Sequence, residues 1–170
     1  MKIRLLLPAF VFTTEIALGG RFDLPKENPQ FSIQLPDQWQ TAVEGDNVTS
    51  RPAKDSKVII SVFPVPAAKN LQDAFAIATK KVSADYSDLK IGKLAEQKQA
   101  GLTFFGGQGE AEKDGFELRL SVAAFTGDGQ AYFALVWAAD EVSGEIHIKE
   151  IDKILTSLQA FKAPPPKAAK

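Results

Sequence analysis

His147 is the only histidine in the 170 residues, and it is the side chain best suited to move a proton near neutral pH. In a helical projection it lies near Ile151 and Ile154, at the start of an apolar stripe. Catalysis by a histidine requires a carboxylate that orients the ring and a nucleophile beside it, and the sequence identifies neither. We therefore interpret His147 as a histidine at the edge of the core, with a general base or a pH switch as the alternative.

Two groups of carboxylates could do chemistry. Glu110 and Glu112 are two residues apart, which places them on one face of a predicted strand, where they could pair as the general acid and base of a hydrolase. Asp85 and Asp88 follow a predicted helix and could form a weak cation site. Charges at such positions usually serve solvation, so we interpret all four as surface residues.

The segment Gly106-Gly107-Gln108-Gly109 has the composition of a phosphate-binding loop. Such loops hold the anion at the N-terminus of a helix that follows at once, whereas Glu110 and Glu112 follow here in a strand pattern. The glycines therefore predict a bulge or a close approach of two backbones. With no cysteine and one histidine, a metal site would need carboxylates almost alone. We expect no metal, no cofactor and no enzymatic activity.

The charges and the length of the chain limit its partners and its organisation. Lys and Arg number 20 against 21 Asp and Glu, so no overall field attracts nucleic acid. The absence of cysteine excludes disulfides and thiol nucleophiles. A chain of 170 residues suffices for one domain with its own core, and we expect a monomer.

Residues 1–19 have the order of a secretory signal peptide. A basic start at residues 1–4 precedes an apolar run at 5–12, and small residues at 17–19 precede a cleavage site before Gly20. The apolar run is too short for a transmembrane anchor. We predict a periplasmic or secreted protein, or its equivalent in a lumen; the alternative is that this segment is a buried N-terminal strand.

The body predicts an antiparallel sheet with two helices. Asn70 is a good N-cap for a helix to Val82, and a second apolar stripe predicts a helix over 143–159. Asp114-Gly115 is a strong hairpin turn, and further turns are predicted at 36–38 and 44–47. Alternating or apolar runs predict strands at 31–35, 57–63, 91–99, 102–113, 116–122 and 132–138. Residues 43–51 predict a short strand or a hairpin with its turn at 44–47.

These elements predict an α+β fold in which two amphipathic helices cover an antiparallel β-sheet. Residues 20–30, with two prolines, read as an extended lead-in. Residues 31–161 form the single domain, and the Pro/Ala/Lys-rich residues 162–170 cannot pack a core and read as a disordered tail.

The two tryptophans have different surroundings in the sequence. Trp137 lies in a run that is apolar on both faces, so we expect it in the core. Trp39 follows a predicted turn and stands between Gln38 and Gln40. We expect it to pack at the edge of the sheet, and it is the candidate partner surface if it is exposed.

The order of the elements and two short motifs resemble the PsbP-like (Mog-like) superfamily, which includes small exported bacterial DcrB-like domains. The first motif, Phe31 to Trp39, is similar to an opening "F-x-x-x-x-P-x-x-W", and the second, Ile154 to Leu158, is similar to an ending "I-x-x-S-F" with leucine in place of the aromatic residue. The resemblance covers residues 31–161 and implies a sheet-and-helix fold whose members mostly bind other proteins. It transfers no functional residue to this chain.

Three functions follow as hypotheses. The first is a non-catalytic exported protein that binds another envelope or lumen protein as an accessory factor. The second is a carrier of a small apolar ligand or lipid, and the third is the carboxylate-based hydrolase. The carrier would line its site with aromatic side chains, namely Phe75, Phe104, Phe105, Phe125 and Phe133.

Overall fold

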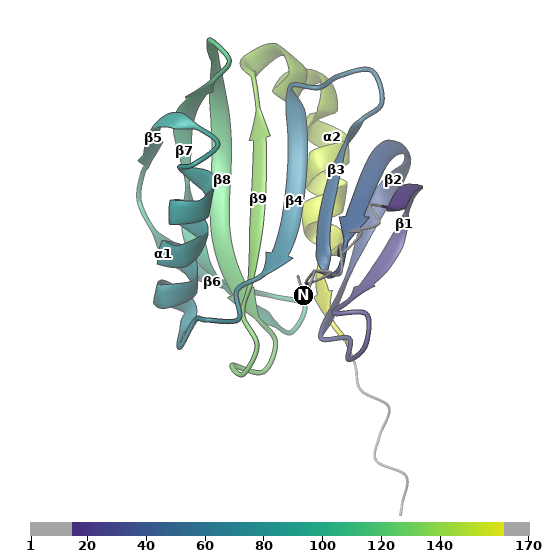
Figure 1. Cartoon of the computed structure of the whole chain (residues 1–170), viewed down its shortest axis with the longest axis vertical. Coiled ribbons are helices and arrows are strands. Elements are labelled where there is room, and N and C mark those ends of the chain that lie inside the picture. The colour runs from purple at the N-terminus through teal and green to yellow at the C-terminus, as the bar shows by residue number, and fades with distance from the viewer. Residues whose placement is uncertain (1–14, 162–170) are drawn as a thin grey trace, which may run out of the picture.

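The computed structural model describes residues 15–161, which form one antiparallel sheet and two helices (Figure 1). The predicted tail at 162–170 and the first 14 residues of the predicted leader lie outside the described residues. The elements follow in the order β1 (Glu15–Leu24), β2 (Phe31–Glu44), β3 (Asn47–Pro52), β4 (Val58–Pro64), α1 (Leu71–Val82), β5 (Ser87–Ile91), β6 (Ala95–Gln99), β7 (Leu102–Lys113), β8 (Phe116–Thr126), β9 (Phe133–Ala139), α2 (Glu141–Ser157) and β10 (Gln159–Ala160).

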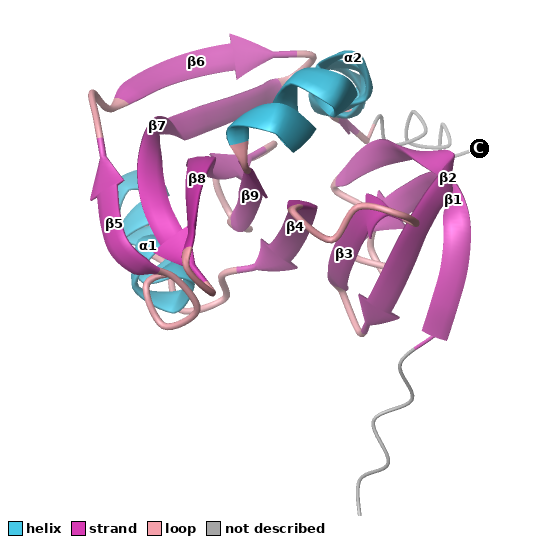
Figure 2. Ribbon diagram, turned by 90° about the horizontal axis from the view of Figure 1, so that it is seen from above, coloured by secondary structure: helices cyan, strands magenta, loops and turns pink. Residues whose placement is uncertain are grey.

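The strands pair in the order β1-β2-β3-β4-β9-β8-β7-β5, with β6 on β7 and β10 on β2, and every pair is antiparallel. The predicted α+β class, with an antiparallel sheet and two helices, is confirmed. Figure 2 shows that the sheet curves around α2, with β6 on one side of this helix and β2 on the other, while α1 lies on the opposite face. Of the helices in residues 15–161, neither has the length and apolar character needed to cross a membrane.

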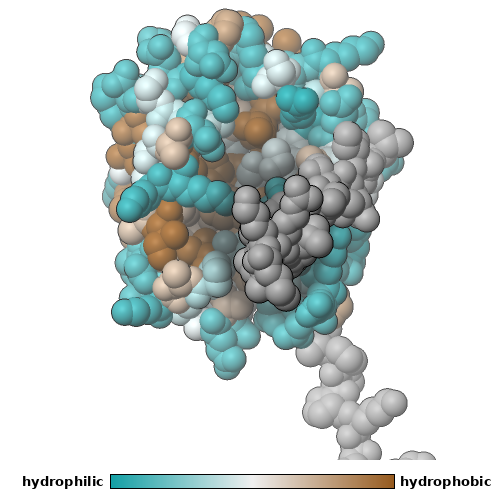
Figure 3. All heavy atoms as spheres, in the orientation of Figure 1, coloured by the Kyte–Doolittle hydropathy of each residue, from teal (hydrophilic) through white to brown (hydrophobic). Residues whose placement is uncertain are grey.

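Strand β9 divides the interior into two cores, because its side chains alternate between the faces of the sheet. Phe133 and Leu135 pack in the core that also holds Ile151 and Ile154 of α2. Ala134, Val136 and Ala138 pack in the core on the α1 side, with Ala74, Ala78 and Val82. Figure 3 shows the face that carries α1, where apolar side chains gather around that helix.

Both helices begin at polar caps. The Asn70 side chain accepts a hydrogen bond from the backbone N–H of Asp73 (2.8 Å), which confirms the predicted start of α1. Helix α2 begins two residues before the predicted Ser143, because the Asp140 side chain accepts from the backbone N–H of Ser143 (2.8 Å). The apolar stripe predicted for this helix is buried at Ile151 and Ile154, but Ile148, one turn earlier on α2, is 46% exposed.

The predicted turn at 36–38 is wrong, because β2 runs without interruption from Phe31 to Glu44. Proline has no backbone N–H, so Pro36 cannot contribute a full pair to the sheet. The neighbouring strand accommodates it with a shift of register between Leu18 and Gly20, and a side chain at Gly19 would overlap the Pro36 backbone. Residues 20–30, predicted as an extended lead-in, are in part a strand, because residues 20–24 pair with β2.

The glycines of β7 predicted a bulge or a close approach of two backbones, and the structure shows the close approach. The pairing of β7 with β8 runs without a register shift from Thr103 to Lys113. A Cβ atom at Gly106 would overlap the Val122 carbonyl, and one at Gly109 would overlap the Lys90 carbonyl. The strand predicted at 91–99 is two strands, β5 and β6, which both pair with β7.

We predict that Gly106→Ala lowers the free energy of unfolding by about 1–3 kcal/mol, because the added methyl group must displace the backbone of β8. Gly127→Ala is the matched control, since its Cβ would meet its nearest neighbour at an ordinary 3.6 Å. Urea denaturation of the two variants measures the difference. Equal stability of the two would contradict the close approach.

Candidate functional site

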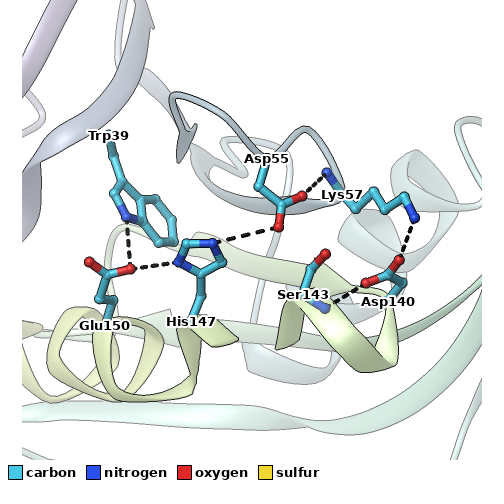
Figure 4. Close-up of polar contacts among 7 residues, drawn as sticks. All are labelled: Trp39, Asp55, Lys57, Asp140, Ser143, His147 and Glu150. Atoms are coloured by element: carbon cyan, nitrogen blue, oxygen red, sulfur yellow. Dashed lines mark hydrogen bonds and ion pairs between the residues drawn. The ribbon is translucent and has the colours of Figure 1, made fainter. Parts of the chain in front are cut away.

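His147 lies between two carboxylates (Figure 4). Its Nδ1 is 2.7 Å from the Glu150 carboxylate, one turn along α2, and its Nε2 is 3.5 Å from Asp55, in the loop between β3 and β4. The sequence identified neither carboxylate, although the three-residue spacing from His147 to Glu150 on a helix was a signal for one of them. Asp55 is distant in sequence and had no such signal.

The Glu150 carboxylate holds α2 against β2. It accepts hydrogen bonds from the side chains of His147, Gln38 and Trp39, the last at 3.4 Å. The bond with His147, followed by those from Gln38 and Trp39, lowers the pKa of Glu150 although burial opposes this shift. The indole of Trp39 also meets the imidazole edge-on, with 6.0 Å between the ring centroids.

This cluster has the carboxylates that a catalytic histidine needs but not the nucleophile. Among the described residues, no hydroxyl group forms a hydrogen bond with His147, and both ring nitrogens face carboxylates. A second pair beside it fixes the start of α2, because Lys57 contacts the Asp140 carboxylate at 2.8 Å (Figure 4). Lys57 and the Ser143 N–H lower the pKa of Asp140 to about 2. The arrangement is one that orients a helix.

Trp39 cannot be a partner surface, which corrects the hypothesis from the sequence. Its side chain is 0% exposed, because α2 covers it and Glu150 binds its N–H. Strand β2 continues through the predicted turn and pairs with β1 on one side and β3 on the other. Trp39 therefore lies in the middle of a strand that is not at the edge of the sheet. Trp137, expected in the core, is instead the tryptophan that is only partly buried.

The predicted carboxylate pair of a hydrolase lies in an open hollow. Glu110 and Glu112 are both exposed, and their neighbours across the β7–β8 pair are Arg119 and Glu117. The hollow has a volume of about 460 Å³, and we call it the acidic hollow; it is lined by Asp88, Lys90, Glu110, Ala111, Glu112, Glu117, Leu118, Arg119 and Glu141. Asp85 lies elsewhere, beside Tyr86 and Lys81 at a smaller hollow on the α1 side. Within residues 15–161, no group of three histidine or acidic side chains is placed to hold a metal ion.

The aromatic side chains proposed for a ligand carrier pack against one another. Phe104, Phe125 and Phe133 join Phe31 in the α2-side core, with ring centroids 4.8–5.6 Å apart. Phe75 and Phe105 form a separate pair, edge to face at 5.6 Å. The five residues therefore do not converge on one cavity, and they carry no argument for a carrier.

The surface that sequence reasoning missed is a groove between α2 and the sheet. Two hollows, of about 310 and 740 Å³, share Arg119, Trp137, Ile148 and Ile151, and we call them together the Trp137 groove. Helix α2 forms one wall, and the segment around Gly92, between β5 and β6, contributes to the other. Helix α2 packs mainly against β2, and Trp137 of β9 stays only partly buried beside it.

A glutamine side chain of β6 holds the C-terminal end of α2, next to Leu155 of the groove. The Gln99 amide, at the end of β6, donates to the carbonyls of Leu155 (2.8 Å) and Leu158 (3.4 Å), where α2 ends. At the other end the groove continues into the acidic hollow, because both are lined by Arg119. Arg119 itself pairs with Glu141 at 2.9 Å.

Comparison with known proteins supports the fold only. No protein-family model matches the chain, and no curated protein matches its sequence. The solution structure of cyanobacterial PsbP (CyanoP) from Synechocystis sp. PCC 6803 is similar with a TM-score of 0.60 and 14% identity, over 86% of this chain and 95% of that one. LpqN of Mycobacterium tuberculosis, described as involved in cell envelope biogenesis, has a TM-score of 0.53 and 11% identity, over 85% and 92%.

A third similar structure is a protein of unknown function from Pseudomonas aeruginosa, described as a putative regulator, with a TM-score of 0.50 and 13% identity over 89% of this chain and 100% of that one. At these identities the likeness concerns the architecture and not the activity. The chain thus has a PsbP-like fold, which confirms that part of the resemblance. Its place among exported DcrB-like domains stays a prediction.

We predict that Glu150→Gln lowers the free energy of unfolding at pH 7 by about 1–3 kcal/mol, because it removes a charged acceptor of hydrogen bonds. The folded-state pKa of Glu150 lies below its ordinary 4.5, so its contribution is present above that value and is lost as the pH falls through the folded pKa. The difference between wild type and variant should therefore shrink below pH 4.5.

Urea unfolding at a series of pH values measures this difference, with Glu145→Gln as the control, an exposed change on the same helix. A difference that stays constant down to acidic pH would show that the charge of Glu150 is not what holds α2.

Proposed function

We propose that this chain is a non-catalytic, exported accessory protein that binds another protein of the periplasm or lumen through the Trp137 groove. The observation that carries the proposal is the position of Trp137, half-buried at an open groove with Ile148 and Arg119 beside it. Aromatic and arginine side chains supply most of the binding energy of protein interfaces. Nearly half of the surface of Ile148 is exposed to solvent, so it is available to contact another protein.

The shape of the groove favours a protein segment over a small molecule. Sites for small ligands enclose most of the ligand surface, with a few placed polar groups. The Trp137 groove instead extends from Leu155 of α2 to Arg119, where it meets the acidic hollow. An elongated, open surface of this kind fits an extended or helical segment of another chain.

Export is supported by the leader and by one neighbour of similar fold. Residues 1–19 have the basic, apolar and small-residue order of a signal peptide. LpqN, whose fold is similar, is described as involved in cell envelope biogenesis. Strand β1 begins at Glu15, so cleavage before Gly20 removes the pairs of residues 15–18 with β2 and leaves those of residues 20–24.

We predict that a photo-crosslinking amino acid at position 148 joins the protein to one reproducible partner in cells that produce it, whereas the same residue at position 146 does not. Both isoleucines are exposed on α2, at 46% and 68%, but only Ile148 lines the groove. Mass spectrometry of the crosslinked bands makes the comparison. Equal capture at both positions, or a lipid retained in the groove of the purified protein, would contradict the proposal.

We predict that the mature protein begins at Gly20 and is found outside the cytoplasm, because the signal peptidase cleaves after small residues. N-terminal sequencing of the fractionated protein tests both points. Replacing the apolar Leu6 with arginine should stop export and leave the leader attached, while Lys167→Arg, outside residues 1–19 of the sequence, serves as the control. Two results would show that residues 1–19 are not a cleaved signal peptide. One is an exported protein that still carries these residues, and the other is a protein that remains in the cytoplasm.

A further inference from the structure

We propose that the segment bound in the Trp137 groove is basic: a large apolar side chain packs on Trp137, and neighbouring lysine or arginine side chains face the carboxylates around the acidic hollow. This inference rests on the proposed function and adds the chemistry of the partner. It follows from the composition of one continuous surface, built by α2, β5, β7, β8 and β9.

The apolar part of the surface is compact and lies at the middle of the groove. Trp137, Ile148 and Ile151 line both of its hollows, and Gly144 leaves room beside them where any larger residue would add a side chain. The hydrogen bonds of Glu150 with β2 and the ion pair of Asp140 with Lys57 hold α2 in a position that leaves Trp137 only partly buried. Burial of the exposed Ile148 and of the remaining accessible surface of Trp137 by a partner's apolar side chain is favourable.

The charges around this apolar centre are mostly negative. Two cations, Lys90 and Arg119, line the groove and the acidic hollow, against eight carboxylates. Asp140 is neutralised by Lys57 and Glu141 by Arg119. The six that form no ion pair within residues 15–161 are Asp88, Glu110, Glu112, Glu117, Glu145 and Asp152.

This excess is local, since the whole chain carries a formal net charge of only −1. Glu112 and Glu117 are direct neighbours on β7 and β8, where like charges repel each other. A cationic side chain placed between them removes that repulsion. The same field repels phosphate groups, so it disfavours nucleic acid and anionic lipid as occupants.

The occupant that satisfies both parts is a polypeptide segment, because it can present an apolar anchor and several cations at fixed spacing. Complementary charge steers the encounter and selects the partner, while the apolar contact at Trp137 slows dissociation. Lys90 and Arg119 restrict where the lysine and arginine side chains of the bound segment can lie, because a cation directly beside either would be repelled.

The test is selection from a displayed library of random peptides about ten residues long, panned on the full-length protein and on Ile148→Ser. Peptides recovered on wild type but not on Ile148→Ser are expected to contain one large apolar residue and an excess of lysine and arginine. Recovery on Ile146→Ser should match the wild type, since that exposed isoleucine lies outside the groove.

Calorimetry with one recovered peptide then tests the charges. Replacing both Glu112 and Glu117 with lysine should weaken binding about tenfold or more, equal to about 1.4 kcal/mol. The control replaces Glu27 and Glu44 with lysine, which makes the same change of net charge at exposed positions far from the groove. Added salt should weaken binding to wild type in the same direction.

The outcomes separate the two proposals. Ile148-dependent peptides without a basic excess, or equal effects of the two charge variants, would overturn the basic partner while the protein-binding function stands. No Ile148-dependent peptide, together with no specific crosslink at position 148, would overturn both. Binding of vesicles rich in anionic lipid through Ile148 would replace the proposed occupant with a membrane.

Discussion

Strand β9 is the constraint on which the rest of the structure depends. Its side chains are apolar on both faces, so the sheet must have a packed core on each side. Small residues, Ala134 and Ala138, let α1 approach one face closely. Larger residues, Phe133 and Leu135, fill the other face around α2. Trp137 lies on the same face of β9 as Phe133 and Leu135, but α2 does not fully cover it, so it is only partly buried.

The polar cluster around Glu150 is what keeps α2 in that position. Burying charged groups is unfavourable unless each finds partners, and here the carboxylate receives hydrogen bonds from Trp39 and His147. Asp55 adds a second carboxylate from another loop. The residues with the most recognisable chemistry in the sequence thus serve to orient a helix. Another surface of that helix, which carries Ile148, lines the Trp137 groove.

Local features of the fold could be predicted from the sequence, and long-range ones could not. Asn70 caps α1 as expected because an N-cap acts within three residues, and Asp114-Gly115 turns the chain between β7 and β8 by its own backbone preference. The uninterrupted β2 escaped prediction because the feature that accommodates Pro36, the irregular Gly19, lies on another strand.

The candidate site was hidden for the same reason. The run from Phe133 to Ala139 is uniformly apolar, and nothing in it distinguishes Trp137 from a core residue. Its exposure depends on where α2 crosses the sheet, which contacts with Trp39 and Asp55 determine from distant parts of the chain. The carboxylates of β7 and β8 were visible, but their meeting at one hollow required the register of two strands.

The unequal burial of the two tryptophans gives the protein a built-in optical reporter. Trp39 is fully buried, whereas Trp137 is in part exposed to solvent. Acrylamide should therefore quench the emission of one indole and spare that of the other. Because the chain contains only these two indoles, the accessible part of the signal comes from the groove alone and needs no attached dye.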